Sequence, residues 1–415
     1  MICGASSTIQ TVILALSVWI SVGFTLSPHL PTTRTFRSNI RTKVVSRSVD
    51  DSKINEEISA ELKQVKTARE IPGKHKWLGG AVDEEGRIYG VPSNAQEVIC
   101  LAPNPDDGEG QYEMHTIPLP ASIAQGQFKW LRGIIWENYL IGIPAWSQAG
   151  VLWVDIGSYW EKKQMNGGVD QNEEGEARSR NENFATVLPL PEGSLDSMVD
   201  DGVTSERWLW HGAALNHNKT AIYAIPSNAQ QVLKIDLRTK TTTLLPIPAT
   251  VTPLSQTNKW YGGILGDDNA IYGVPYAASG VLRIDANTDT VELIGEDMFG
   301  VMEYNWHGGI KHPSNGKIYC FPAHNSHVLA IDTGSSKNDA MSLEERLSLL
   351  EIHRAPYDKD EVTRYKWLGG SLGADGNIYG EIANIVFRFV LLFHRFLLNG
   401  SLSFTQGCHQ MLQQY

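Results

Sequence analysis

A short sequence pattern occurs six times along the chain, and it constrains the fold more than any other feature. Each copy begins with a tryptophan followed by small residues, continues with a segment like Ile-Tyr-Gly-x-Pro, and in most copies reaches Val-Leu-x-Ile-Asp. The intervals between successive tryptophans are 53, 80, 50, 46 and 61 residues. Such a period is typical of arrays whose repeats pack against their neighbours. The repeat tryptophans are Trp77, Trp130, Trp210, Trp260, Trp306 and Trp367.

Within each copy we expect four strands. The tryptophan segment is the first, the proline-terminated segment the second, and the Val-Leu segment the third. Turn-forming runs such as Glu84-Glu85-Gly86 separate the first two strands. Four strands make one propeller blade, so the sequence predicts an all-β, six-bladed β-propeller with four-stranded antiparallel blades over residues 64–391. The expected fourth strands are 114–119, 184–190, 241–247 and 291–294.

Two insertions lengthen the array, and the last copy is incomplete. Residues 157–183 are polar and predict a solvated loop, whereas the insertion at 335–350 contains a candidate short helix, Met341–Leu347. The sixth copy lacks a convincing fourth strand, but an unassigned strand-like run, Val65–Ile71, precedes the first. We therefore expect an N-terminal strand to complete the last blade, which removes two open edges. We expect residues 392–415 to form an irregular tail.

The first 49 residues are predicted to be a targeting segment rather than part of the fold. They contain no Asp or Glu, and the apolar run Ile9–Phe24 precedes Ser- and Thr-rich sequence with five basic residues. This order resembles a signal peptide followed by a transit peptide, as in plastid import, with residues 50–63 as a linker. Secretion and a membrane anchor are the alternatives. The apolar run is short for a stable span, so none is expected in the mature chain.

Composition excludes several classes of function. The formal net charge of −11 disfavours a nucleic-acid surface. The four cysteines form no CxxC pair, which excludes a disulfide framework or a zinc site of that type. The common nucleophile, metalloprotease, phosphate-loop and EF-hand motifs are also missing from the sequence. We expect a monomer whose ligand is an unidentified protein or small molecule.

Candidate site residues are those that break the repeat in a polar direction. The tryptophans themselves are expected to pack blade against blade, with an aromatic ring at the channel mouth as the alternative. His211 and His307 replace the Leu or Tyr that follows the tryptophan in the other copies, and Arg132 replaces a glycine. His324 and His327 flank an asparagine in a connection between the second and third strands.

These residues leave two kinds of function open. The first is a binding or scaffold propeller that presents one face or its central channel to a protein, a small molecule or a glycan. The second is a hydrolase or lyase at the central channel, in which histidines bind a metal or act as bases. That alternative requires His211, His307 and Arg132 to converge near the axis. Solvated or hydrogen-bonded histidines would explain the same pattern without a site, and a purely structural plastid factor is a third hypothesis.

The repeat also resembles a known kind of propeller. Ile271–Pro275, Val281–Asp285 and Asp375–Tyr379 are similar to repeats of the NHL and streptogramin-lyase type. Those propellers share a general likeness with regucalcin-like gluconolactonases, in which acidic and amide side chains hold a metal in the channel. The resemblance therefore implies a propeller and keeps a divalent metal in the central channel open. It assigns no metal ligand or catalytic residue to a position of this chain.

Overall fold

The computed structural model describes the repeat region of the chain. The expected targeting segment, the linker, the N-terminal strand that would complete the last blade, and the tail all lie outside the described residues. The described residues are 74–104, 112–146, 150–165, 183–194, 208–248, 256–299, 304–334, 341–351, 366–373 and 375–382.

Six antiparallel sheets follow one another along the chain, and each takes its strands in sequence order. The first three sheets have four strands each, joined mainly by short turns. The first blade contains β1 (Trp77–Val82), β2 (Ile88–Pro92), β3 (Glu97–Pro103) and β4 (Tyr112–Pro118). The second contains β5 (Trp130–Trp136), β6 (Tyr139–Pro144), β7 (Val151–Asp155) and β8 (Ala185–Leu188). The third contains β9 (Trp210–Leu215), β10 (Ala221–Pro226), β11 (Gln231–Asp236) and β12 (Thr241–Pro246).

The next two blades repeat this plan, and the sixth is described by its first two strands. The fourth blade contains β13 (Trp260–Leu265), β14 (Ala270–Pro275), β15 (Val281–Asp285) and β16 (Thr290–Ile294). The fifth contains β17 (Trp306–Lys311), β18 (Ile318–Pro322), β19 (His327–Ile331) and β20 (Leu347–Glu351). The sixth contains β21 (Trp367–Leu372) and β22 (Ile378–Ile382).

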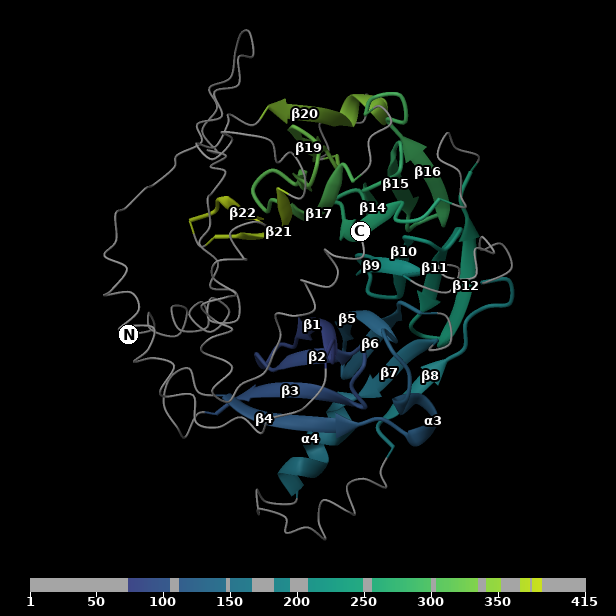
Figure 1. Cartoon of the computed structure of the whole chain (residues 1–415), viewed down its shortest axis with the longest axis vertical. Helices are drawn as coiled ribbons and strands as arrows, with labels where there is room; N and C mark the ends of the chain where they lie inside the picture. The colour runs from purple at the N-terminus through teal and green to yellow at the C-terminus, as the bar shows by residue number, and fades with distance from the viewer. Residues whose placement is uncertain are drawn as a thin grey trace.

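The sheets lie around a common axis, with the first strand of each innermost. Successive first strands β1, β5, β9, β13, β17 and β21 contact one another in that order. Figure 1 shows β1, β5, β9, β17 and β21 towards the centre, and β4, β8, β12, β16 and β20 at the periphery. The predicted six-bladed propeller is therefore confirmed. Residues on the first strands are the ones that can meet near the axis.

A continuous chain of backbone hydrogen bonds links all six blades. Two kinds of bond alternate in this chain. Within a blade, the residue that follows the proline at the end of the second strand donates its N–H to the carbonyl of the residue before the repeat tryptophan. Between blades, that same residue accepts at its carbonyl from the N–H of the residue before the next repeat tryptophan. Lysine side chains reinforce some of these links: the fully buried Lys259 donates to the carbonyls of Ser227 and Gln256. The residues joined in order are Lys76, Ser93, Lys129, Ala145, Leu209, Ser227, Lys259, Tyr276, Asn305, Ala323 and Lys366.

The repeat tryptophans pack between blades while bonding within their own. Trp130 of the second blade belongs to the same buried cluster as Val91 and Val98 of the first. Its indole N–H donates to the carbonyl of Gly150, just before the third strand of its own blade. Gly142 lies beside the ring, because a Cβ there would be 3.3 Å from Cγ of Trp130. The same indole bond to the third-strand edge occurs from Trp77, Trp210, Trp260 and Trp306.

Two inserted segments differ from the sequence prediction. Instead of a loop from residue 157, Ile156–Met165 forms helix α4. Trp160 explains the difference, because it packs edge-on against His115 and donates to the Tyr89 hydroxyl of the first blade. The helix predicted over 341–347 is reduced to a 3-10 turn at Glu344–Arg346, and β20 begins immediately afterwards as the fourth strand of its blade.

A further short helix, α3 (Ala121–Ala124), joins the first two blades. Within the described ranges, no helix is long and apolar enough to cross a membrane.

Candidate functional site

Arg132 stands at a position that the architecture normally gives to glycine. The equivalent residues in the first, third, fourth and fifth blades are Gly79, Gly212, Gly262 and Gly308, all with left-handed φ between 68° and 112°. The left-handed φ favours glycine at all four positions, and close approach adds to this at Gly212, where a Cβ would be 2.7 Å from Cα of Gly262. Arg132 has no such φ, and its side chain is exposed. An arginine there has no evident architectural purpose.

The Arg132 guanidinium is a cation without an acidic partner in the described part of the chain. Crowding by surrounding protein lowers its pKa, although the side chain remains accessible to solvent. Both observations suit a position on the innermost strand of a ring of blades. Arginine stays protonated under all ordinary conditions, so the charge persists.

Two histidines from other blades lie close to this charge. The rings of His211 on β9 and His307 on β17 are 6.0 Å apart between centroids, with their planes near perpendicular. Burial, then His307 and Arg132, hold the pKa of His211 well below its ordinary value. Burial and Arg132 lower the pKa of His307 to about 4, although a hydrogen bond to the Leu368 backbone opposes the shift. Both imidazoles are therefore neutral at pH 7.

His211 carries an unsatisfied polar atom. The side chain is only 8% exposed, and its Nδ1 makes no hydrogen bond within the described residues. A buried polar atom without a partner is costly, so its presence in a native fold needs an explanation. A ligand that donates to Nδ1, or accepts from it in the other tautomer, would supply one.

Two tyrosines complete the group. Tyr261 stacks on His211 at 3.9 Å and on Tyr276 at 4.2 Å, whereas His307 meets both tyrosines edge to face at 5.1 and 5.5 Å. The Tyr261 hydroxyl donates to the side chain of Asn258, which fixes the ring. We call Arg132, His211, Tyr261, Tyr276 and His307 the axis cluster.

The remaining two candidates lie outside this cluster. His324 contacts Tyr304 edge to face at 5.2 Å, and Tyr304 in turn packs on Tyr276. His327 begins β19, where its carbonyl accepts the Trp306 indole bond and its ring bonds Ser326. It therefore holds the blade together. Among the described residues, no group of three or more His, Cys, Asp or Glu side chains is arranged to hold a metal ion.

Sequence reasoning missed the residues two places before each repeat tryptophan. Five of them are described, none is glycine, and all are left-handed, with φ between 49° and 62°. Their constant offset from the tryptophan was the signal that could have revealed them. They are His75, Phe128, Trp208, Asn258 and Tyr304.

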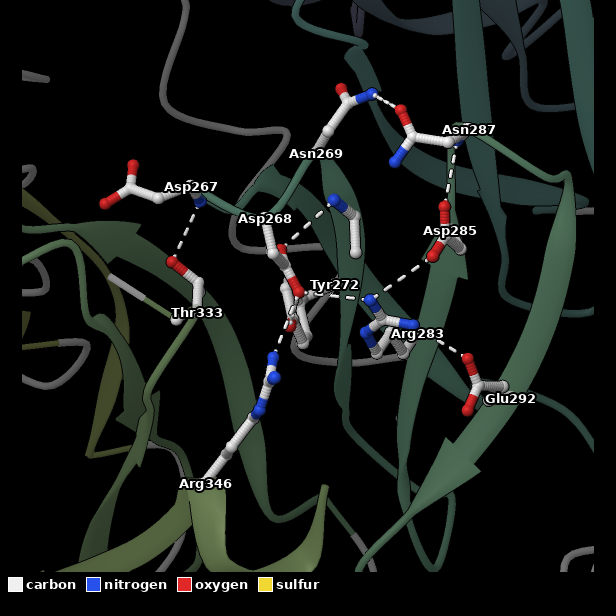
Figure 2. Close-up of polar contacts among 12 residues, drawn as sticks. Asp267, Asp268, Asn269, Tyr272, Arg283, Asp285, Asn287, Glu292, Thr333 and Arg346 are labelled. Atoms are coloured by element: carbon white, nitrogen blue, oxygen red, sulfur yellow. Dashed lines mark hydrogen bonds and ion pairs between the residues drawn. The ribbon is translucent and has the colours of Figure 1, made fainter. Parts of the chain in front are cut away.

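A second polar cluster lies at the opposite end of the strands (Figure 2). Asp268, in the turn between β13 and β14, accepts hydrogen bonds from the Tyr272 hydroxyl, Arg283 and Arg346. Arg283 also pairs with Glu292 at 2.7 Å, and its side chain is largely buried. Burial and Asp268 raise the pKa of Tyr272 to about 12. We call this the Asp268 network; it ties the fourth blade to the fifth through paired charges.

Comparison with known proteins finds structural neighbours at low sequence identity. No protein-family model matches it, and no curated protein is detectably similar in sequence. Similar solved structures include a streptogramin B lyase (14% identity over 76% of this chain and 85% of the other, TM-score 0.46). A virginiamycin B lyase from Staphylococcus aureus has 12% identity over 74% and 85%, TM-score 0.46. A putative 6-phosphogluconolactonase from Bacteroides uniformis has 8% identity over 77% and 80%, TM-score 0.45.

The resemblance to streptogramin-lyase-type propellers that the repeat predicted is thus confirmed among the structural neighbours. At these identities and TM-scores, the likeness does not extend to activity, substrate or site residues.

Proposed function

We propose that the protein is a binding propeller whose axis cluster takes a small anionic ligand, with Arg132 as its anchor. The supporting observation is the exposed guanidinium of Arg132, which replaces a repeat glycine and has no acidic partner in the described residues. A guanidinium matches the two oxygens of a carboxylate or phosphate with parallel hydrogen bonds. The ligand would supply the missing counter-charge.

The neighbours of Arg132 suit the same ligand. Neutral histidines can donate one N–H and accept one hydrogen bond each, so His211 and His307 can read polar groups beside the anion. The unsatisfied Nδ1 of His211 is one such contact point. Tyr261 and Tyr276 hold these rings in place by stacking. The cluster therefore offers one fixed charge and two adaptable polar contacts.

The test restores the repeat. Arg132→Gly gives the second blade the residue found at this position in the five other blades, so the fold should tolerate it. The full chain and the variant are titrated calorimetrically with acetate, D-galacturonate and inorganic phosphate. We expect at least one anion to bind the native chain, and Arg132→Gly to weaken it at least tenfold. Arg132→Lys should give an intermediate affinity, because lysine keeps the positive charge but cannot donate two parallel hydrogen bonds to one carboxylate or phosphate.

Failure of all three anions to bind would contradict the proposal, as would equal binding by Arg132→Gly. A circular-dichroism melt of each variant shows whether a lost affinity reflects a lost fold.

A second candidate, a hydrolase or lyase at the axis, is favoured by one observation. The rings of His211 and His307 lie 6.0 Å apart, and the charge of Arg132 contributes to the lowered pKa of both. A neutral imidazole beside a cation can accept a proton while the cation stabilises a developing negative charge. The low pKa of both histidines makes them weak bases, which is why binding is the first proposal.

Turnover separates the two candidates. An ester or lactone of the anion that binds best is incubated with the native chain, and products are followed by NMR. Product formation that disappears in His307→Leu would replace the binding proposal with the enzymatic one.

A further inference from the structure

Three aromatic side chains and a histidine form a partly exposed group beside the axis cluster. Phe128 contacts His75 at 5.4 Å, Trp146 at 4.8 Å and Trp208 at 5.2 Å between ring centroids. All four side chains are half-buried, unlike the fully buried repeat tryptophans. We call His75, Phe128, Trp146 and Trp208 the aromatic rim. It crosses the first three blades, at the end where Arg132 and His211 lie.

The backbone holds part of the rim in a conformation that large side chains avoid. Phe128 and Trp208 have φ of 49° and 53°, in the left-handed region. Five of the other non-glycine residues with positive φ lie in tight turns. The remaining three, His75, Asn258 and Tyr304, share the position of Phe128 and Trp208, two residues before a repeat tryptophan. Neighbouring contacts fix the conformation: Asn94 accepts from the Phe128 N–H, and the Trp208 carbonyl accepts from Asn228 N–H. The left-handed position is thus a feature of the repeat, and what distinguishes Phe128 and Trp208 is the large aromatic ring that each one presents there.

The second blade carries two unusual side chains at this end. Arg132 replaces a glycine, and Trp146 occupies a variable position that holds Asn94 and Asn228 in the first and third blades, Ala277 in the fourth and His324 in the fifth. Those asparagines bond the backbone of the next blade, at Phe128 and Asn258. In the second blade the indole of Trp146 stands at this position, and it has no side-chain oxygen that could accept such a bond. Arg132 and the half-buried Trp146 therefore place a cation and an indole on one blade at this end, where a single ligand can contact both.

The rim geometry favours a sugar ring over a flat aromatic ligand. A flat ring binds best between parallel faces, but the parallel pairs His211–Tyr261 and Tyr261–Tyr276 are already closed at 3.9 and 4.2 Å. Phe128 instead meets its neighbours at tilts of 39° to 58°. Tilted, half-exposed rings present single faces, on which the C–H groups of a pyranose can stack.

We propose that the axis cluster and aromatic rim together bind an acidic oligosaccharide, with a uronate carboxylate on Arg132 and the next sugar on Phe128 and Trp208. This assignment rests on the proposed anion site and names its ligand class. The rim supplies affinity through stacking, and Arg132 selects for the carboxylate.

The test removes the stacking surface without disturbing the backbone. Asn258 shows that asparagine fits the same left-handed position in the fourth blade, so Phe128→Asn and Trp208→Asn should fold. Lys219→Asn is the matched control, a left-handed residue in the turn between β9 and β10 at the other end of the blade. Calorimetry on the full chain compares D-galacturonate, trigalacturonate and the neutral maltotriose.

We expect trigalacturonate to bind at least tenfold more tightly than galacturonate, and maltotriose at least tenfold more weakly than trigalacturonate. Phe128→Asn and Trp208→Asn should lower the affinity for trigalacturonate to that for galacturonate, and should leave the affinity for galacturonate unchanged. Lys219→Asn should change neither affinity. Equal binding of monomer and trimer, insensitivity to both rim variants, or equal binding of maltotriose would overturn the assignment.

If neither galacturonide binds, the saccharide assignment also fails. The acetate and phosphate titrations with Arg132→Gly then show separately whether the anion site survives.

Discussion

The axis cluster and the Asp268 network lie at opposite ends of the propeller strands and differ in how their charges are balanced. In the network, Arg283 and Arg346 share Asp268, and Arg283 pairs with Glu292 as well. In the axis cluster, Arg132 has no acidic partner in the described residues, and His211 Nδ1 makes no bond there. A buried charge that loses its partner costs stability, whereas an exposed charge such as Arg132 is solvated and remains available to a ligand.

The largest effect should come from breaking the network. Asp268→Ala leaves Arg283, which is 8% exposed, and Arg346 without their shared carboxylate. Arg283 keeps Glu292, but the largely buried Arg346 loses its acidic partner and the link between two blades is broken, so we expect a loss of roughly 2–4 kcal/mol in the free energy of unfolding. Chemical denaturation measures it.

Asp267 provides the neighbouring control. It pairs with Lys311 at 2.7 Å on a more exposed surface, so Asp267→Ala should cost no more than about 1 kcal/mol. Similar losses in the two variants would show that the network is not held by buried charge.

A smaller effect is expected from acid acting on the axis cluster. The folded state lowers the pKa of His307 to about 4, whereas a histidine in the unfolded chain has a pKa near 6.5. At a pH below 6.5 the unfolded chain therefore binds more protons than the folded one. The contribution of neutral His307 to the free energy of unfolding is therefore fully present above about pH 6.5. It is lost as the pH falls towards 4, by an amount on the order of 2 kcal/mol. Arg132, His211 and the two tyrosines are the groups that face His307.

His307→Leu tests this origin, because leucine occupies the same position in the first, second and sixth blades. Its unfolding free energy should change less than that of the native chain between pH 7 and 4.5. Identical pH profiles would assign the acid sensitivity to other groups.

The smallest effect is expected from restoring the repeat at the other histidine. His211→Leu removes a buried unsatisfied atom and installs the residue used in three other blades, so it should stabilise the fold by about 1 kcal/mol. Denaturant midpoints compare the two chains. A loss above 1 kcal/mol would mean that His211 is a structural residue, which would weaken the contrast between the two clusters.

Much of the fold could be predicted because its signals are local. The alternation and turn residues of each copy lie within about ten residues of one another, and β12 and β16 begin at or within one residue of the expected positions. Helix α4 could not be predicted, because its polar sequence is held by contacts of Trp160 with His115 and Tyr89 of another blade.

For the candidate site, the sequence determined which residues depart from the repeat: Arg132, His211 and His307 stand out against the other copies. It could not determine whether they meet, because they come from the second, third and fifth blades and the angle between successive blades brings them together. Only the tertiary structure showed that His211 and His307 lie 6.0 Å apart while His327 supports a strand edge. It also showed that Phe128 and Trp208 are left-handed: their place two residues before a repeat tryptophan is visible in the sequence, but the φ angle depends on hydrogen bonds with neighbouring segments.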